Sequence, residues 1–446
     1  YRADFYRAAN ARWFAENRKL PAGYAWWNQF TEISTNNRKA QIAMLEELAA
    51  TPQKEGTPER RLADLYSSVL RIDDRNARGY EPIRAYVAGY RNAKSVRELV
   101  EADARCLEGL GFSVLLGFSV IPSDNGATGL SHWGPLPMVN VRYRPGNHSD
   151  PYIVYLTKLF TLSGNPPADA ERKARRVYAL ESQLAAAGRS AVEAQKNQNG
   201  VTYPFYLFRT LYGDVDFAEM FARMRFKTPE YVIVQDQGIL EKGASFFTEA
   251  RREDLALYAE ARLLHNFSLW LSKDFFRARS AFTASIQGSR DFTRKPDWLR
   301  ESALDAACIW LPNDLGKAFV ARNFSAESKR DVEGMIARLV SQYKKEISGC
   351  EWMTERTKAR AIEKLDRLDV KVGYPEAWGS AEGRAVLGPV LFENIAELNR
   401  GLIERGREML LEREVRRTWT VPAYTVNAFY YPGRNEIVFP AGFLQP

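Results

Sequence analysis

The sequence predicts a mainly α-helical protein with one short β-hairpin near its C-terminus. Apolar residues recur at helical spacing along most of the 446 residues, and several of these stretches begin with a capping residue. Strand signals are few by comparison. The chain is about two to three times as long as a typical domain, so we expect two lobes.

The first helices are predicted from their ends. Thr57 is placed to cap a helix that has Pro58 in its first turn, and Ser95 forms a capping box with Glu98 before an apolar stripe. Gly188 follows another apolar stripe and is a suitable stop for it. These patterns predict helices that pack against a core.

Two further helices are predicted in the C-terminal third. Thr354 begins one of them, and a longer amphipathic helix is expected between residues 328 and 347. The apolar stripe of this longer helix consists of Val332, Met335, Ile336, Leu339, Tyr343 and Ile347. We expect this stripe to form core.

The strand candidates are residues 112–121 and a C-terminal hairpin. Apolar and polar residues alternate over residues 424–430, and residues 435–439 return as a second strand. Between them, Pro432–Gly433 suits the two central positions of a type II turn.

Composition excludes several classes of protein. Hydrophobic residues make up 45% of the chain and charged residues 26%, which is ordinary for a globular protein. The 63 basic residues are interleaved with 55 acidic ones. The sequence therefore lacks the dense basic stripe that is typical of a nucleic-acid binder. The longest apolar run, residues 111–121, is too short to cross a bilayer. The three cysteines form neither a disulfide framework nor a zinc finger.

No complete catalytic motif is present. A metallopeptidase helix needs H-E-x-x-H, but the only histidines are His132, His148 and His265, each without a second ligand at that spacing. G-x-S-x-G, P-loop and dinucleotide-binding motifs are also missing. From its own residues the chain offers no catalytic or metal-binding group.

The C-terminal hairpin resembles the neprilysin and endothelin-converting-enzyme family of zinc metallopeptidases. The matching residues are 426–430 (VNAFY) and 433–446 (GRNEIVFPAGFLQP). Shorter matches follow the family order upstream, at Asp4–Phe5–Tyr6, Trp27–Phe30, Leu311–Pro312, Trp352–Thr354 and Gly373–Pro375. The resemblance covers nearly the whole chain and is strongest over residues 300–446.

The resemblance implies a mainly helical, two-lobed, zinc-dependent endopeptidase that acts on short peptides. In the family the Asn-Ala of the hairpin strand holds the substrate backbone, which carries over to Asn427 and Ala428. Phe429 would help to line a side-chain subsite, and Phe30 would approach the substrate from the other lobe. The alternative interpretation of the hairpin is an ordinary structural strand.

The family's zinc motif lies shortly beyond the point where this sequence ends, at Pro446. We therefore expect zinc to be ligated by a part outside this chain, either a second polypeptide carrying H-E-x-x-H or the rest of a longer enzyme, and the chain alone to be inactive. A non-catalytic peptide-binding or regulatory member is the alternative. The scarcity of cysteines resembles bacterial members, and export to the periplasm, cell surface or medium fits the family.

Three segments are expected along the chain. Residues 1–50 would belong to the catalytic lobe or the lobe junction, and residues 51–300 would form the helical second lobe. Residues 301–446 would be a helical region that leads into the substrate-binding hairpin.

Overall fold

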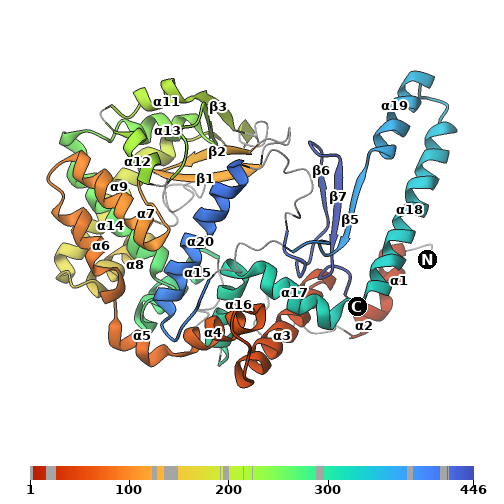
Figure 1. Cartoon of the computed structure of the whole chain (residues 1–446), viewed down its shortest axis with the longest axis horizontal. Coiled ribbons are helices and arrows are strands. Elements are labelled where there is room, and N and C mark those ends of the chain that lie inside the picture. Colours follow the sequence, from red (N-terminus) through yellow and green to blue (C-terminus); the bar gives the residue numbers. More distant parts are fainter. Residues whose placement is uncertain are drawn as a thin grey trace.

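The protein is mainly helical, with two small sheets. The computed structural model describes residues 4–16, 27–122, 128–134, 149–190, 192–193, 200–213, 215–223, 225–287, 296–378, 385–411, 419 and 421–445. A large group of helices occupies one side of the molecule, and a small sheet with two projecting helices occupies the other (Figure 1). We call these two regions the helical body and the arm.

The helical body contains most of the elements. Its helices are α4 (Pro58–Leu70), α5 (Ile72–Arg78), α6 (Glu81–Asn92), α7 (Val96–Leu110), α8 (Ser149–Leu162), α9 (Pro167–Ala187), α11 (Phe205–Thr210), α12 (Phe217–Arg223), α13 (Gln237–Ala244), η1 (Glu249–Arg251), α14 (Arg252–Phe267), α15 (Lys273–Gln287), α16 (Trp298–Trp310) and α20 (Leu391–Leu411). Its strands are β1 (Gly117–Pro122), β2 (Thr128–Trp133), β3 (Val201–Pro204) and β4 (Tyr231–Val234).

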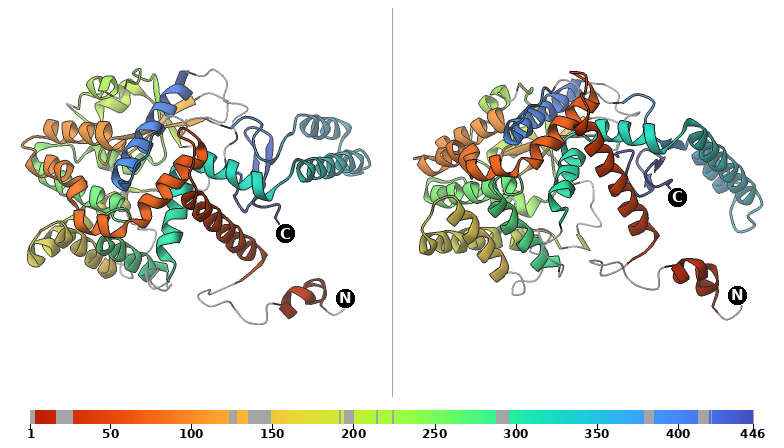
Figure 2. Two further views of the ribbon diagram at one scale, coloured as in Figure 1. Left: turned by 60° about the horizontal axis from the view of Figure 1, so that its bottom comes forward. Right: turned by 90° about the horizontal axis from the view of Figure 1, so that it is seen from below.

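The arm is formed by later parts of the chain. It consists of α18 (Ala326–Ser348), α19 (Glu355–Asp366), β5 (Asp369–Gly373), β6 (Phe429–Tyr431) and β7 (Glu436–Pro440). Helices α3 (Gln29–Ala50) and α17 (Pro312–Asn323) lie between the arm and the body (Figure 1). The short N-terminal helices α1 (Phe5–Ala9) and α2 (Ala11–Glu16) lie beyond α3 (Figure 2).

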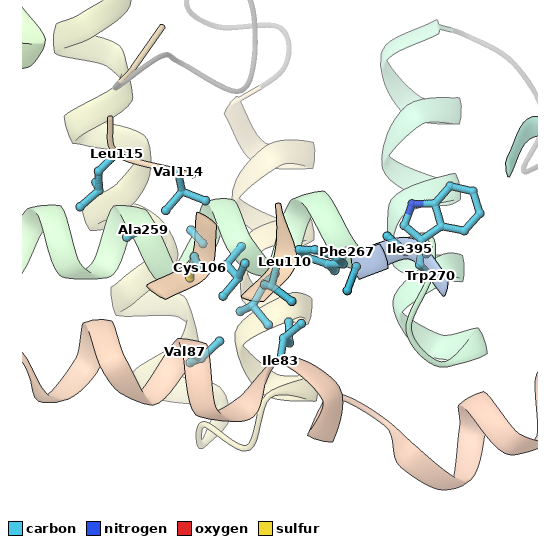
Figure 3. Close-up of a cluster of buried hydrophobic side chains, with 14 of the residues drawn as sticks. Ile83, Val87, Cys106, Leu110, Val114, Leu115, Ala259, Phe267, Trp270 and Ile395 are labelled. Carbon is cyan, nitrogen blue, oxygen red and sulfur yellow. The ribbon is translucent and has the colours of Figure 1, made fainter. Parts of the chain in front are cut away.

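The body is built around one extensive buried cluster. Helix α14 lies near its centre and buries residues on every side, from Leu255 to Phe267. Side chains from α6, α7, α14 and α20 point toward one another in this cluster (Figure 3). The same cluster includes Leu45 of α3 and Leu304 of α16, so all three segments expected from the sequence contribute to it. The segment boundaries near residues 50 and 300 stay predictions.

Helix starts follow the capping residues. The Thr57 hydroxyl accepts the N–H of Arg60 at the start of α4, with Pro58 in the first turn. The Ser95 hydroxyl accepts the N–H of Glu98 at the start of α7. Thr354 caps α19 in the same way. These caps satisfy backbone donors that have no partner inside the helix, and the predicted helix starts are confirmed. The capping box at Ser95 differs in its second bond, because the Glu98 carboxylate accepts the N–H of Lys94.

The body also contains a sheet that the sequence interpretation largely missed. Its strand order is β1-β2-β4-β3, with β2 and β4 parallel and the other pairs antiparallel. Only β1 falls in an expected strand region, residues 112–121. The strands β3 and β4 have four residues each, which is too short for an alternation pattern to stand out between helices.

The apolar stripe of α18 is less buried than the sequence predicts. The helix forms as expected, but Ile336 is its only buried residue. Met335, Leu339 and Tyr343 are 49%, 53% and 61% exposed. The neighbouring α19 contacts α18 but fully buries none of its own residues, so the two helices cover each other's apolar faces only in part. The prediction that this stripe forms core is wrong for the chain by itself.

None of the described helices combines the length and the apolar character that crossing a lipid bilayer requires.

Candidate substrate-binding edge of the arm sheet

The arm sheet has the strand order β5-β7-β6, which leaves β6 at one edge. Strands β6 and β7 are antiparallel, with Phe429 opposite Val438 and Tyr431 opposite Glu436. Strand β5 runs parallel to β7 on its other side. No described strand pairs with the outer edge of β6, so its backbone groups are available to an added strand.

The hairpin turn differs from the predicted type. The N–H of Arg434 donates to the carbonyl of Tyr431, as a four-residue turn requires. Gly433, however, is not in the left-handed region that a type II turn demands. Asn435 takes that conformation instead, with φ of 49°. Its side-chain nitrogen donates to the carbonyl of Lys364, which ties the turn to the end of α19.

Strand β6 is also shorter than the alternation over residues 424–430 predicts. The N–H of Thr425 donates to the carbonyl of Pro422, so the chain turns before the strand begins. The N–H of Gly442 then donates to the carbonyl of Ala423, which joins the segment before β6 to the segment after β7. A Cβ at position 442 would lie 2.1 Å from the carbonyl oxygen of Tyr424, so only glycine permits this approach.

A buried ion pair joins β5 to β7 in the arm sheet. The Lys371 ammonium on β5 lies 2.7 Å from a carboxylate oxygen of Glu436 on β7. Glu436 is fully buried, and the Lys371 side chain is 12% exposed. A buried carboxylate is costly unless a cation compensates it. This pair therefore fixes β5 to the first residue of β7 and holds the sheet in register.

Asn427 and Ala428 lie directly before β6, and Phe429 is the first residue of this edge strand. Asn427 is exposed, whereas Ala428 and Phe429 are half-buried. The Asn427 side-chain oxygen accepts the N–H of Ala428 at 2.9 Å, and its amide nitrogen makes no hydrogen bond within the described residues. The Phe429 ring stacks on Tyr431, two residues further along the same face of β6.

Phe30 lies elsewhere, on the first turn of α3. Its ring is 51% exposed and lies 5.8 Å from the ring of Phe443. The Asn37 amide donates to the carbonyl of Gly442 and fixes α3 to the segment that follows β7. Phe30 is thus held next to the hairpin through Phe443, and no contact of its ring with residues 427–429 is found among the described ring interactions.

Sequence reasoning missed the third strand and the ion pair of this site. The residues Asp369–Gly373 alternate between polar and apolar positions, which is a strand signal, but the run has only five residues. Lys371 and Glu436 are 65 positions apart, so only the fold brings them together.

The histidines do not form a metal centre in the described part of the chain. The His132 ring in β2 contacts the carbonyls of Gly117 and Gly134 and the hydroxyl of Tyr212, and burial lowers its pKa to about 4. His265 lies on α14, where burial, with nearby arginines, holds its pKa well below the ordinary value. His148 is outside the described residues. Among those that are described, no three His, Cys, Asp or Glu side chains are grouped to hold a metal ion.

Known proteins resemble this chain in sequence and in structure. Neprilysin-3 of Drosophila melanogaster is 25% identical over 99% of this chain and 60% of its own length. The zinc metalloprotease Zmp1 of Mycobacterium tuberculosis, in an open state, is 25% identical with a TM-score of 0.86, covering 99% of this chain and 70% of that protein. PepO of Lactobacillus rhamnosis is 20% identical with a TM-score of 0.87, covering 99% and 71%.

These structures confirm the mainly helical, neprilysin-like fold. The chain spans 60% of the length of Neprilysin-3 and about 70% of the two bacterial structures. The model of peptidase family M13 matches residues 2–375, which is most of the sequence. The chain therefore belongs to peptidase family M13.

Proposed function

We propose that this chain provides the substrate-binding edge of a zinc-dependent endopeptidase that acts on short peptides. The observation that carries the proposal is the open outer edge of β6, with Asn427 and Ala428 directly before the strand. An extended peptide can add to such an edge, where main-chain hydrogen bonds supply affinity and side-chain pockets supply specificity.

Each edge residue has a distinct part in this proposal. The Asn427 amide offers a donor and an acceptor, and an incoming peptide would replace its local bond to the N–H of Ala428. Phe429 and Tyr431 present a stacked aromatic pair for a substrate side chain. Phe30 is expected to contact the substrate from α3, next to Phe443.

Zinc is expected in the assembled enzyme but not on this chain. Its described residues offer no suitable group of ligands, and the sequence has no H-E-x-x-H. We infer that a further region, on a second polypeptide or on the same longer one, carries these ligands. The exposed Met335, Leu339 and Tyr343 of α18 support this inference, because adjacent apolar side chains on a protein surface can mark a contact site. This chain alone is then inactive.

A non-catalytic peptide-binding or regulatory protein is the second candidate. The intact Asn427–Ala428 edge would serve a peptide-binding protein as well as an enzyme. The two candidates agree on peptide binding at β6 and differ only on hydrolysis.

A peptide titration tests the shared part of both candidates. Binding of a short, blocked peptide to the purified chain is measured by ligand-observed NMR with Asn427→Ala and with Asn92→Ala, an exposed asparagine at the end of α6, as the matched control. We expect Asn427→Ala to weaken binding by roughly tenfold, the worth of a hydrogen bond or two, and Asn92→Ala to leave it unchanged. Equal binding by both variants would remove β6 as the substrate edge.

Hydrolysis separates the two candidates. A fluorogenic peptide is incubated with zinc and this chain alone, and then with preparations that also contain an H-E-x-x-H region. The endopeptidase proposal predicts turnover only in the second case, with Asn427→Ala lowering kcat/KM by roughly 10- to 100-fold through loss of positioning. Binding without turnover in either case supports the regulatory protein.

Export from a bacterial cell, to the periplasm, cell surface or medium, is also part of the proposal. Fractionation of producing cells tests it, because recovery of the chain only in the cytoplasmic fraction would contradict export.

A further inference from the structure

A second recognition site is suggested by a small pocket on the helical body, far from β6. The pocket lies where α5, the start of α6, the connection between α14 and α15, and the start of α20 meet. Three arginines line it, Arg75 and Arg78 of α5 and Arg71 directly before this helix, together with apolar side chains that include Trp270, Leu391 and Phe392. About 40 Å³ of the pocket is open to water-sized molecules, which is room for a carboxylate group, so any larger apolar part of a ligand would lie at the mouth of the pocket. We call it the α5 pocket.

Arg75 is the unusual member of this group. Arg75 is 6% exposed, and its guanidinium donates to the backbone carbonyls of Leu271, Leu269 and Val69. No carboxylate pairs with it in the described part of the chain, and burial lowers the pKa of the guanidinium to about 10. A buried cation without an anion keeps an unfavourable desolvation cost. Three of its five N–H groups are used, so two remain for another acceptor.

The other charges around the pocket add to this excess. Arg71 is paired with Asp74 at 2.7 Å, so these two roughly cancel. Arg78 is exposed and has no ion pair among the described residues. Asp74 is the only acid in the lining, against three arginines. Helix α20 begins at Leu391 in the pocket wall, and the start of a helix carries partial positive charge.

The remaining surface of the pocket is apolar. Trp270 and Phe392 face it from different elements, and Trp270 is itself 7% exposed and packed edge-on against Trp310. A bare inorganic anion would leave this apolar wall without a partner. A carboxylate attached to an apolar group would satisfy both parts, because planar guanidinium groups match carboxylates and the aromatic walls bury the apolar group.

We propose that the α5 pocket binds a monocarboxylate that carries an aromatic or branched apolar group, such as the C-terminal residue of a peptide or a free organic acid. Arg78 and the two remaining N–H groups of Arg75 hold the carboxylate. Phe392, which is half-buried, contacts its apolar group at the mouth of the pocket.

Ligand-observed NMR on the whole chain tests this site with a matched pair of probes. The probes are N-acetyl-phenylalanine and its uncharged amide, with sodium sulfate as a third, inorganic anion. We expect the acid to bind with a dissociation constant on the order of 1 mM, as the small number of contacting atoms allows. The amide and sulfate should bind at least roughly fivefold more weakly, because each lacks one half of the recognition.

Variants locate the binding. Arg78→Gln removes an exposed charge without disturbing any described hydrogen bond and should weaken binding of the acid by roughly five- to tenfold. The matched control is Arg209→Gln on α11, another exposed arginine, on the opposite side of the body (Figure 1), which should bind like the parent. A tripeptide ending in phenylalanine then identifies the source: tighter binding than the short acid supports a peptide C-terminus, and weaker binding supports a free acid.

Three results would overturn the proposal. Equal binding of acid and amide would show that the arginines take no part. Sulfate binding as tightly as the acid would show that the apolar wall takes no part. Unchanged binding by Arg78→Gln would place the ligand elsewhere on the chain.

Discussion

The helical body and the arm obtain their stability in different ways. The body buries a continuous cluster that runs from α3 to α20, with α14 enclosed on all sides. A much smaller cluster lies next to the arm, where Phe319 and Val320 of α17 and the following Phe324 meet Ala423 and Ala441. Its long helix α18 keeps an apolar stripe in solvent. The described part of the body therefore packs around one large cluster, whereas the arm leaves apolar side chains of α18 exposed.

The proposed function lies in the less complete region. The open edge of β6 and the exposed stripe of α18 both belong to the arm. A peptide and a zinc-carrying region are the two occupants that the proposal requires, and both need free surface. In this proposal the body supplies stability, and the arm supplies the free surface for the peptide and for the zinc-carrying region.

The largest expected effect comes from the ion pair that holds the arm sheet. Lys371→Met leaves the buried carboxylate of Glu436 without a cation, which should cost about 3–5 kcal/mol. Amide hydrogen exchange in β5, β6 and β7 measures this loss locally. Glu363→Gln is the control, because it breaks an exposed pair with Arg367 of the same 2.7 Å length on α19 and should change stability by less than about 0.5 kcal/mol. Unchanged protection in Lys371→Met would mean that the pair does not hold the sheet.

A matched pair of leucines measures the contrast between the two cores. Leu263→Ala on α14 removes a fully buried side chain and should destabilise the protein by about 2–5 kcal/mol. Leu339→Ala on α18 removes a side chain that is 53% exposed and should cost less than about 0.5 kcal/mol. Denaturant unfolding of both variants gives the comparison. Similar losses would show that the arm is packed as tightly as the body.

Acid should weaken the helical body through His132. Burial lowers the pKa of His132 to about 4, below its ordinary value of 6.5, so the unfolded chain takes up this proton first as pH falls. The stability contributed by neutral His132 is complete above pH 6.5 and is lost progressively down to about pH 4, by up to roughly 3 kcal/mol. His132→Gln should flatten this part of the stability curve. A curve with the same slope in the variant would assign the acid sensitivity to other groups.

The smallest expected effect concerns the apolar stripe of α18 in the assembled enzyme. Met335→Ser should leave the stability of the isolated chain unchanged within about 0.5 kcal/mol, because the side chain is 49% exposed. It should weaken association with a zinc-carrying region by roughly three- to tenfold, since a buried methionine contributes apolar area at an interface. Affinity measured by calorimetry tests this, with Arg330→Gln, an exposed arginine on the same helix, as the control. Equal affinities for both variants would place the interface elsewhere.

The sequence predicts local structure well where the cause is local. The caps at Thr57, Ser95 and Thr354 act through bonds to residues three positions away, so each is visible in the sequence. The apolar period of α18 shows which face of the helix is apolar but not whether another element covers that face. The stripe was therefore predicted as core, although three of its six residues are exposed and only Ile336 is buried.

The candidate site depended on relations over long distances. The alternation over residues 424–430 indicates a strand, but the turn at Pro422–Thr425 shortens it, and Asn435 rather than Gly433 takes the left-handed conformation. The partner strand β5 and the pairing of Lys371 with Glu436 come from tertiary structure. The roles of Asn427 and Ala428 came from family resemblance, because an exposed asparagine before a strand has no chemical signature of its own.

The central claim is that this chain holds the peptide while a region outside it supplies zinc. Denaturing intact-mass analysis of a preparation that hydrolyses a short peptide in a zinc-dependent manner tests this most directly. We predict that every active preparation contains H-E-x-x-H, either on a second polypeptide or on a chain heavier than the 50.8 kDa of this sequence. Zinc-dependent hydrolysis by a single species of 50.8 kDa would contradict the claim.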